Sequence, residues 1–310
     1  MKSMYIKSHD NQKVYLHKWE DVQNPIGVVQ IFHGMAEHAA RYDRFANFLN
    51  SKGYIVYADD HRGHGKTAES VEKLGYLGEN GFDNIVKDEH FITDKIKAEH
   101  PNLPIFIFAH SFGSFVGQEY LNRYSNEING LILSGSAMQD RIDAKFGLAL
   151  TKLINKFGDE SKQNPLLESL IFGSYCKKEK DNNSKFAWLS SDKDEVKKYD
   201  EDEYCGTVFT TNFYRNMFTG FQGLYLKEKA DTIRKDIPVL VLAGEMDPVG
   251  NYGKSVKSLF EYYKSLNMSN VELKLYPEGR HELLNETNRD EVFDYIYSWL
   301  QKNNKGCIFK

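Results

Sequence analysis

Cysteine and proline are scarce in this 310-residue chain, which contains three cysteines and seven prolines. The cysteines, Cys176, Cys205 and Cys307, are odd in number, widely spaced and without a C-x-x-C pair. This pattern argues against a disulfide framework and against a zinc site built on paired cysteines, and it is typical of reduced thiols. We therefore expect a cytoplasmic protein.

The chain also lacks a strong charge of one sign and a long apolar run. Its formal net charge is −4, so no excess of basic side chains is available to neutralise a phosphate backbone, and we expect no nucleic-acid partner. Apolar runs such as 105–109 and 239–243 are far shorter than the roughly 20 residues that span a bilayer. The first residues do not have the layout of a secretory signal. These features predict a soluble protein.

The remaining composition is that of a globular protein, with 41% hydrophobic and 27% charged residues. An alternating pattern at 4–7 and 14–19 predicts an antiparallel hairpin. Short apolar runs follow, as in parallel strands that are buried on both faces, and they cover 27–32, 54–58, 104–109, 131–134 and 238–243. Amphipathic helical patterns separate most of these runs. The sequence therefore predicts an α/β fold with a mostly parallel sheet and flanking helices.

This alternation stops between Ala137 and Ile233, where no strand pattern of the sheet type occurs. We predict a helical cap or lid at 137–233, inserted between a first core part at 1–136 and a second at 234–310. The first helix of this segment has an apolar stripe that consists of Ile142, Phe146, Leu150, Leu153, Ile154 and Phe157. This stripe could pack on the core or make transient contact with a lipid surface.

A strand at 104–109 leads directly into His110-Ser111-Phe112-Gly113 and then into a helical pattern. A serine in a tight turn between a strand and a helix is a nucleophile elbow, normally written G-x-S-x-G. Ala109 stands at the first glycine position here. Ser111 is therefore the candidate nucleophile, with His110 and Gly113 as supporting residues. An ordinary turn serine is the alternative unless a base and an acid accompany it.

The histidines provide that test, because a serine nucleophile needs an imidazole base. In an α/β fold with a nucleophile elbow, that base follows the serine in the chain. Of the ten histidines only His281 follows Ser111, and it lies in a loop between a strand-like stretch and the last helical pattern. Asp247 follows the strand at 238–243 and is the expected acid, with Glu245 as its rival. With His281 as the base, activity should fall on the acid side of about pH 6 to 7.

An oxyanion hole needs a second N–H group in addition to that of Phe112. The strand at 27–32 ends in His33-Gly34-Met35. We predict that the Met35 N–H completes the hole, that Gly34 shapes the loop and that His33 supports it through hydrogen bonds.

Five motifs occur together in a recognisable order: 32–38 followed by Arg41-Tyr42, then 60–65, 110–113, 244–247 and 279–282. In this respect the chain resembles the monoacylglycerol lipase and lysophospholipase group of the α/β-hydrolases, the serine aminopeptidase S33-like set. The resemblance implies hydrolysis of carboxylic esters of acyl lipids through an acyl-enzyme, with a small acyl ester as substrate and neither metal nor organic cofactor. Peptidase, thioesterase and acyltransferase activities on the same fold stay open. The oligomeric state also stays open.

Three alternatives belong to other classes. The stretch at 60–67 matches a P-loop except at its first position, Asp60, which would suit a nucleotide hydrolase. Asp60, His61 and His64 are residue types that ligate metals. A non-catalytic binder could also keep the fold, although the complete Ser-Asp-His set argues against it.

Overall fold

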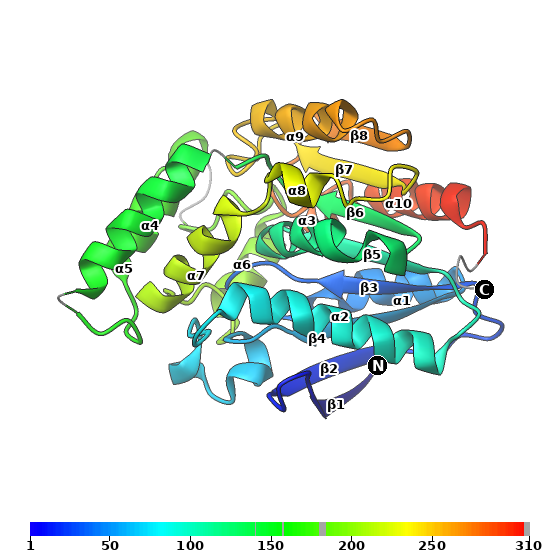
Figure 1. Ribbon diagram of the computed structural model, residues 1–310, viewed down its shortest axis with the longest axis horizontal. Coiled ribbons are helices and arrows are strands. Elements are labelled where there is room, and N and C mark those ends of the chain that lie inside the picture. Colours follow the sequence, from blue (N-terminus) through cyan, green and yellow to red (C-terminus); the bar gives the residue numbers. More distant parts are fainter. Residues whose placement is uncertain (140, 157, 180–183, 307–310) are drawn as a thin grey trace.

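A computed structural model describes residues 1–139, 141–156, 158–179 and 184–306. Its centre is an eight-stranded sheet in the order β1-β2-β4-β3-β5-β6-β7-β8 (Figure 1). In chain order the strands are β1 (Lys2–Lys7), β2 (Lys13–Trp19), β3 (Gly27–Phe32), β4 (Tyr54–Asp60), β5 (Ile105–His110), β6 (Gly130–Ser134), β7 (Val239–Gly244) and β8 (Val271–Tyr276). The expected strands are all present, and β4 extends two residues further than predicted.

The two N-terminal strands form an antiparallel hairpin that pairs with β4, and the other neighbouring strands run parallel. Every residue of β3 to β7 is buried, because helices cover both faces of the sheet. In the register Phe32 pairs with Ala109, and His110 pairs with Ser134. The chain therefore leaves β3, β5 and β6 at the same edge of the sheet. The prediction of an α/β fold with a mostly parallel sheet is confirmed.

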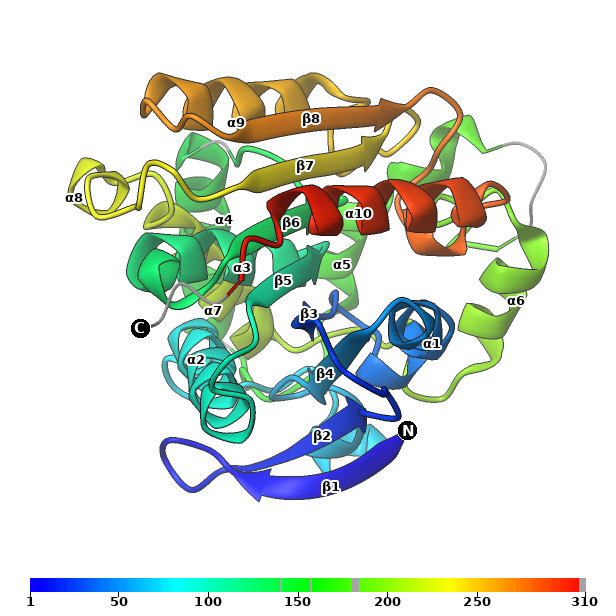
Figure 2. The same ribbon diagram turned by 90° about the vertical axis from the view of Figure 1, so that its right-hand side faces the viewer.

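The described helices are α1 (Asp43–Ser51), α2 (Gly81–Glu99), α3 (Phe112–Tyr124), α4 (Arg141–Asn155), α5 (Pro165–Phe172), α6 (Lys193–Glu201), α7 (Thr211–Gln222), α8 (Lys227–Ala230), α9 (Lys254–Ser265) and α10 (Arg289–Asn303). Helices α1 and α10 cover one face of the sheet, where their apolar residues form one hydrophobic cluster with it (Figure 2). Helices α2, α3 and α9 contribute to a larger cluster on the other face. No described helix has the length and apolarity needed to cross a bilayer.

The segment between β6 and β7 contains α4 to α8, of which α4, α5 and α7 lie beyond the carboxyl ends of the parallel strands (Figure 1). Lys229 of α8 instead pairs with Glu119 of α3. Apart from one isolated bridge, the described residues of this segment form no β structure. The apolar stripe of α4 is divided. Leu150 and Ile154 pack against the core, whereas Ile142, Phe146 and Leu153 are 74%, 71% and 58% exposed. Phe157 lies outside the described residues, as does Cys307.

The loop after β4 does not have the form of a P-loop. Asp60 is the last residue of β4, and the lysine and threonine of the motif lie in a single 3-10 turn, Gly65–Ala68. The Asp60 carboxylate accepts hydrogen bonds from the N–H groups of Ala39 at 2.9 Å and Lys66 at 2.7 Å. The carboxylate is therefore used within the loop, and the motif does not open a long helix, since α2 begins only at Gly81. For both reasons the structure does not support a nucleotide site.

The structure likewise does not bring Asp60, His61 and His64 together as metal ligands within the described chain. His61 instead lies against two other buried carboxylates, with its Nδ1 3.1 Å from Glu89 Oε1 and 3.4 Å from Asp59 Oδ2. Its Nε2 is 3.1 Å from the carbonyl oxygen of His33. Both ring nitrogens therefore face acceptors. Burial alone would lower the pKa of His61, but the carboxylates outweigh burial and raise the pKa to about 10.

This raised pKa predicts a pH-dependent stability. The His61 imidazolium should stabilise the fold fully below the unfolded pKa of about 6.5, and this contribution should be lost as the pH rises through about 10. Denaturant unfolding between pH 6 and 10 should therefore show a declining free energy of unfolding. In His61→Gln the same plot should be flatter. Equal slopes in the two proteins would mean that His61 is not protonated in the folded state.

Candidate active site

Ser111 lies in a sharp turn between β5 and α3. Its backbone has φ +52° and ψ −123°. Residues other than glycine rarely adopt a positive φ. The turn is held by a hydrogen bond from the Ser111 N–H to the carbonyl oxygen of Ser134 at 3.0 Å. A second runs from the Ser114 N–H to the Ser111 carbonyl oxygen at 2.8 Å. These bonds offset the local strain and fix the direction of the Ser111 side chain.

Small neighbours make this turn sterically feasible. A Cβ atom on Gly113 would overlap the carbonyl oxygens of Phe32 and His33, so the helix start can approach β3 only with glycine there. Ala109 faces Gly117 of α3, where an added Cβ would lie 2.9 Å from the Ala109 Cβ. Gly117 thus leaves space for the methyl group of Ala109, which explains how the elbow accommodates alanine at the usual glycine position.

His281 lies between Ser111 and Asp247 at the carboxyl edge of the sheet. Its Nε2 is 2.8 Å from Ser111 Oγ, and its Nδ1 is 2.8 Å from Asp247 Oδ2. The other carboxylate oxygen of Asp247 accepts the Val249 N–H at 2.8 Å. Both Asp247 and His281 are buried. Within the described structure no hydrogen bond joins Glu245 to His281, so Asp247 is the carboxylate that contacts the imidazole.

The surroundings of His281 set its charge. Burial alone would lower its pKa, but the Asp247 carboxylate outweighs burial and raises the pKa above the ordinary 6.5. The ring of His110 lies 4.8 Å from the His281 ring. Burial, with a further contribution from His281, lowers the pKa of His110 to about 4. His110 is therefore neutral and packs beside His281 without a competing charge.

The loop that follows β3 forms the opposite side of the site. A Cβ atom on Gly34 would lie 3.0 Å from Ser111 Cβ, so this loop passes directly over the serine. Met35 and Phe112 line the same cavity as Ser111 and His281. Neither the Met35 N–H nor the Phe112 N–H donates to another protein group in the part of the chain that is described. Both donors can therefore serve an oxyanion at this position.

His33 supports that loop from the core side. It is fully buried, its Nδ1 lies 2.7 Å from the Gly34 carbonyl oxygen, and its Nε2 accepts the His61 N–H at 2.9 Å. One ring nitrogen donates and the other accepts, which is the pattern of a neutral imidazole. Burial, together with the charge of His61, lowers the pKa of His33 well below its usual value. Both ring nitrogens of His33 are therefore hydrogen-bonded, one to Gly34 of this loop and one to His61.

An ion-pair network that the sequence analysis did not assign links the two sides of the site. Arg41 donates to both carboxylate oxygens of Glu282 at 2.7 Å, and to Glu37 at 2.5 Å. Glu37 in turn accepts the Gly34 N–H at 2.5 Å. Because Glu282 follows His281, this network ties the loop over Ser111 to the loop that carries the imidazole. The four-residue spacing of Glu37 and Arg41 was visible in the sequence, but the pairing with Glu282 was not.

The segment between β6 and β7 also contacts the His281 loop. The Glu282 N–H donates to the Leu189 carbonyl oxygen at 2.7 Å. Arg280 donates to the carbonyl oxygens of Ala187 at 2.7 Å and Ser190 at 3.0 Å. The Trp188 ring lies 4.9 Å from the His281 ring. Backbone and ring contacts therefore join this segment to His281.

A cavity of about 360 Å³ opens above Ser111 and His281. Its walls come from both the sheet edge and the segment between β6 and β7, and most of the side chains from that segment are apolar. They include Phe172, Trp188, Met217, Phe218 and Phe221. Such a space suits an apolar chain attached to a group that reacts with Ser111.

Comparison with known proteins finds a matching family model and relatives that are similar over most of the chain. A family model described as "Serine aminopeptidase, S33" matches residues 23–288. The chain is 28% identical to a monoacylglycerol lipase of Mycolicibacterium smegmatis, over 91% of this chain and 90% of that protein. It is 26% identical to a monoglyceride lipase homolog of monkeypox virus, over 94% and 95% of the two chains.

Among solved structures, a thermostable carboxyl esterase from Bacillus coagulans in complex with glycerol has a TM-score of 0.89. It is 28% identical to this chain and the match covers 98% of both chains. The family model spans most of the sequence, and the strand-turn-helix around Ser111 and the loop around His281 lie inside the matched range. This chain therefore belongs to the serine aminopeptidase S33 family of α/β-hydrolases.

Proposed function

We propose that this protein is a serine hydrolase that cleaves carboxylic esters of acylglycerols, with Ser111, His281 and Asp247 as its catalytic triad. The observation that carries the proposal is the continuous hydrogen-bonded series from Ser111 Oγ through His281 to Asp247, at the base of a cavity with apolar walls. A serine hydroxyl becomes a competent nucleophile when an imidazole removes its proton and a carboxylate orients that imidazole.

The geometry supports an acyl-transfer mechanism. Ser111 Oγ attacks the ester carbonyl carbon while His281 Nε2 takes the serine proton. The N–H groups of Met35 and Phe112 hold the oxyanion that develops. His281 then gives the proton to the departing alcohol oxygen, which leaves an acyl-enzyme on Ser111. Water, deprotonated by His281, hydrolyses that ester and restores the serine.

The substrate class rests on the relatives and on the cavity together. Two of the relatives are called monoacylglycerol lipase and monoglyceride lipase homolog, and the similar esterase structure holds glycerol. Apolar walls suit an acyl chain. We infer that the acyl chain lies among the aromatic side chains and that the glycerol is the alcohol that leaves.

We further propose that residues 137–233 form a cap over the site. This segment supplies cavity walls such as Trp188 and Phe221. The cap would exclude water from the acyl-enzyme except for the water that hydrolyses it.

The outer face of this cap supports transient contact with a lipid surface. Phe146 and Leu153 on α4 are exposed, and so are Leu166 and Leu170 on α5, at 60% and 62%. The neighbouring Lys145 is also exposed. An exposed apolar face beside basic side chains is the pattern of a helix that lies on a membrane surface. Such contact would bring the cavity close to aggregated acylglycerol.

Replacing the nucleophile is the direct test of the proposed function. Ser111→Ala should lower turnover by about a thousandfold or more, because the remaining groups cannot form an acyl-enzyme. The substrate panel is monoacylglycerols, p-nitrophenyl esters, lysophospholipids, acyl thioesters and aminoacyl anilides. Ser258→Ala, an exposed serine on α9, is the matched control. The wild type and the control should react with a fluorophosphonate probe, and Ser111→Ala should not.

Unchanged ester turnover in Ser111→Ala would remove this residue from the mechanism. Faster cleavage of the anilides than of any ester would instead favour a peptidase.

The raised pKa of His281 predicts the position of the acid limb of the pH profile. The base must be neutral to accept the serine proton, so kcat/KM should fall as the pH drops through the pKa of His281. Because Asp247 raises that pKa, the half-maximal point should lie above 6.5, at the upper side of the range expected for an ordinary histidine. A rate that is constant from pH 5 to 8 would contradict His281 as the base.

The lipid contact can be tested on the cap face alone. The double variant Phe146→Ser with Leu153→Ser should bind phosphatidylcholine vesicles at least about tenfold more weakly, because two side chains no longer enter the interface. Turnover of a dissolved short-chain ester should stay the same. Tyr5→Ser, an exposed aromatic residue on β1, is the control. Equal vesicle binding by all three proteins would refute the lipid-facing role of this face.

A further inference from the structure

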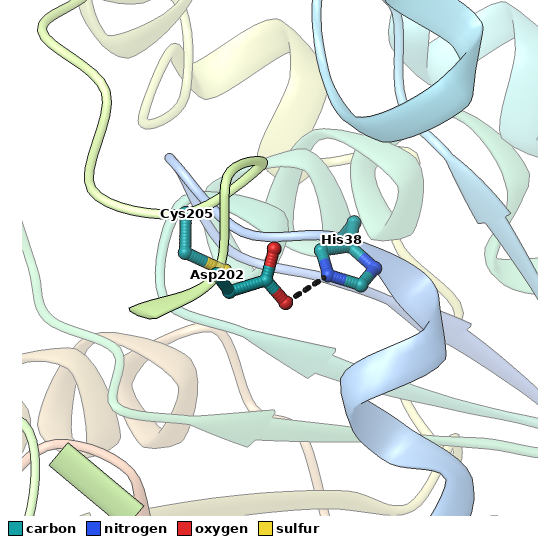
Figure 3. Close-up of side chains that lie close together, drawn as sticks. All are labelled: His38, Asp202 and Cys205. Carbon is teal, nitrogen blue, oxygen red and sulfur yellow. Dashed lines mark hydrogen bonds and ion pairs between the residues drawn. The ribbon is translucent and has the colours of Figure 1, made fainter. Parts of the chain in front are cut away.

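His38, Asp202 and Cys205 converge outside the proposed triad, at a junction of two distant segments (Figure 3). His38 lies in the loop after β3, and the other two lie between α6 and α7. One donor atom from each side chain lies within 4.8 Å of the other two. His38 Nε2 is 2.9 Å from Asp202 Oδ2. A nitrogen, an oxygen and a sulfur donor therefore point into one small volume.

The backbone holds two of these donors in advance. The Cys205 N–H donates to the Asp202 carbonyl oxygen at 3.0 Å, which makes a tight turn. Asp202 Oδ1 accepts the Tyr204 N–H at 2.9 Å, so the carboxylate keeps one oxygen fixed and turns the other toward His38. The Tyr204 ring packs edge-on against the His38 ring at 5.9 Å. Little ordering is needed for the three side chains to act together.

The chemistry of these donors is that of a site for a borderline-soft cation. Cys205 is only 9% exposed, and burial raises the pKa of its thiol, so the sulfur carries a proton while no cation is near. Burial also disfavours the charge of Asp202, but the hydrogen bond from His38 outweighs it and keeps the pKa of that carboxyl low. The nearby Arg41 is already paired with Glu37 and Glu282. Its charge is therefore largely compensated and repels an incoming cation weakly.

We propose that His38, Asp202 and Cys205 form a binding site for a zinc-like divalent cation. Zinc binds thiolate at about 2.3 Å, imidazole nitrogen at about 2.0 Å and carboxylate oxygen at about 2.0 to 2.2 Å in a tetrahedron, with water as the fourth ligand where the protein supplies three. Tetrahedral ligands are then about 3.3 to 3.8 Å apart, so the His38–Asp202 hydrogen bond opens by a few tenths of an ångström. On binding, Cys205 Sγ loses its proton to solvent, and the sulfur electron pair goes to the metal.

The site lies where a cation would restrain the loop over Ser111. Two residues before His38, the Ala36 carbonyl oxygen accepts the Gly206 N–H at 3.0 Å and the Tyr199 hydroxyl at 2.7 Å. Ala36 itself has a backbone φ of +54°, which is strained for a residue other than glycine. A cation held from both segments would replace the His38–Asp202 hydrogen bond with metal–ligand bonds, and Cys205 would join that connection. Any consequence for turnover rests on the proposed function, but the binding of the cation does not.

Cobalt provides the test, because Co²⁺ replaces zinc and a thiolate ligand gives it a charge-transfer band in the near ultraviolet. The purified full-length chain should bind about one equivalent of Co²⁺ with that band, and Zn²⁺ should displace the cobalt and remove the band. Cys205→Ser should lose the band. His38→Gln and Asp202→Asn should bind at least about tenfold more weakly. Zn²⁺ should raise the melting temperature of the wild type but not of Cys205→Ser.

Three control variants separate this site from other sources of binding. Cys176→Ser, the other described thiol, should keep the band. His90→Gln, which removes a ligand from the surface group of His90, Asp94 and Glu127, should leave the affinity unchanged. Ser111→Ala should also bind normally, so that loss of turnover and loss of the cation site are told apart. Far-ultraviolet circular dichroism establishes that each variant is folded, and Asp202→Asn replaces Cys205→Ser if the latter does not fold.

Two results would overturn the proposal. One is a wild type that binds neither Co²⁺ nor Zn²⁺ more tightly than Asp202→Asn. The other is a charge-transfer band that persists in Cys205→Ser, since the thiolate would then come from elsewhere.

Discussion

The hydrogen bond between His281 and Ser111 joins residues that are 170 positions apart in the chain, and the site depends on it. No local pattern can hold two such distant side chains at 2.8 Å. The sheet does so, because parallel strands end at one edge and the loops that leave them meet there. The register of β3, β5 and β6 determines where Ser111 and the loop over it lie, and β7 and β8 deliver Asp247 and His281 to the same edge.

Around that bond, buried charges hold the loops in one arrangement. Arg41 pairs with Glu37 on the loop over Ser111 and with Glu282 beside His281. Buried ion pairs contribute little net stability, because desolvation of the charges offsets their attraction, but removing one partner leaves an uncompensated charge. The value of this network is therefore positional. It excludes arrangements in which the two loops separate, and His33 and His61 provide a similar constraint beneath the loop.

Much of this arrangement could be read from the sequence, and the limits of that reading have physical reasons. Continuous apolar runs identify strands that are buried on both faces, so the sheet and its helices were predictable. The turn at Ser111 and the single histidine after it narrowed the candidates to residues that the structure places within hydrogen-bond distance. Contacts between side chains that are distant in the sequence could not be predicted in this way. Neither the partner of Arg41 nor the split of the α4 stripe into packed and exposed residues is determined by spacing along the chain.

The cluster of His38, Asp202 and Cys205 is the clearest case of this limit. His38 and Asp202 are 164 positions apart, whereas the zinc patterns that a sequence reveals are short repeats of cysteine and histidine. The absence of a paired-cysteine motif argues only against zinc sites whose ligands are close together in the sequence. A site assembled from two segments needs the fold before it can be seen.

The segment between β6 and β7, the proposed cap, contacts the His281 loop through residues 187–190. Leu189 accepts the backbone N–H of Glu282, and Arg280 donates to the carbonyl oxygens of Ala187 and Ser190. A displacement of residues 187–190 would pull on the loop that carries His281, the proposed base. Helix α4 carries no such link among the bonds described and packs against α7 instead. A substrate path that displaces 187–190 would break these hydrogen bonds to the His281 loop, whereas a path that leaves 187–190 in place would keep the proposed triad assembled.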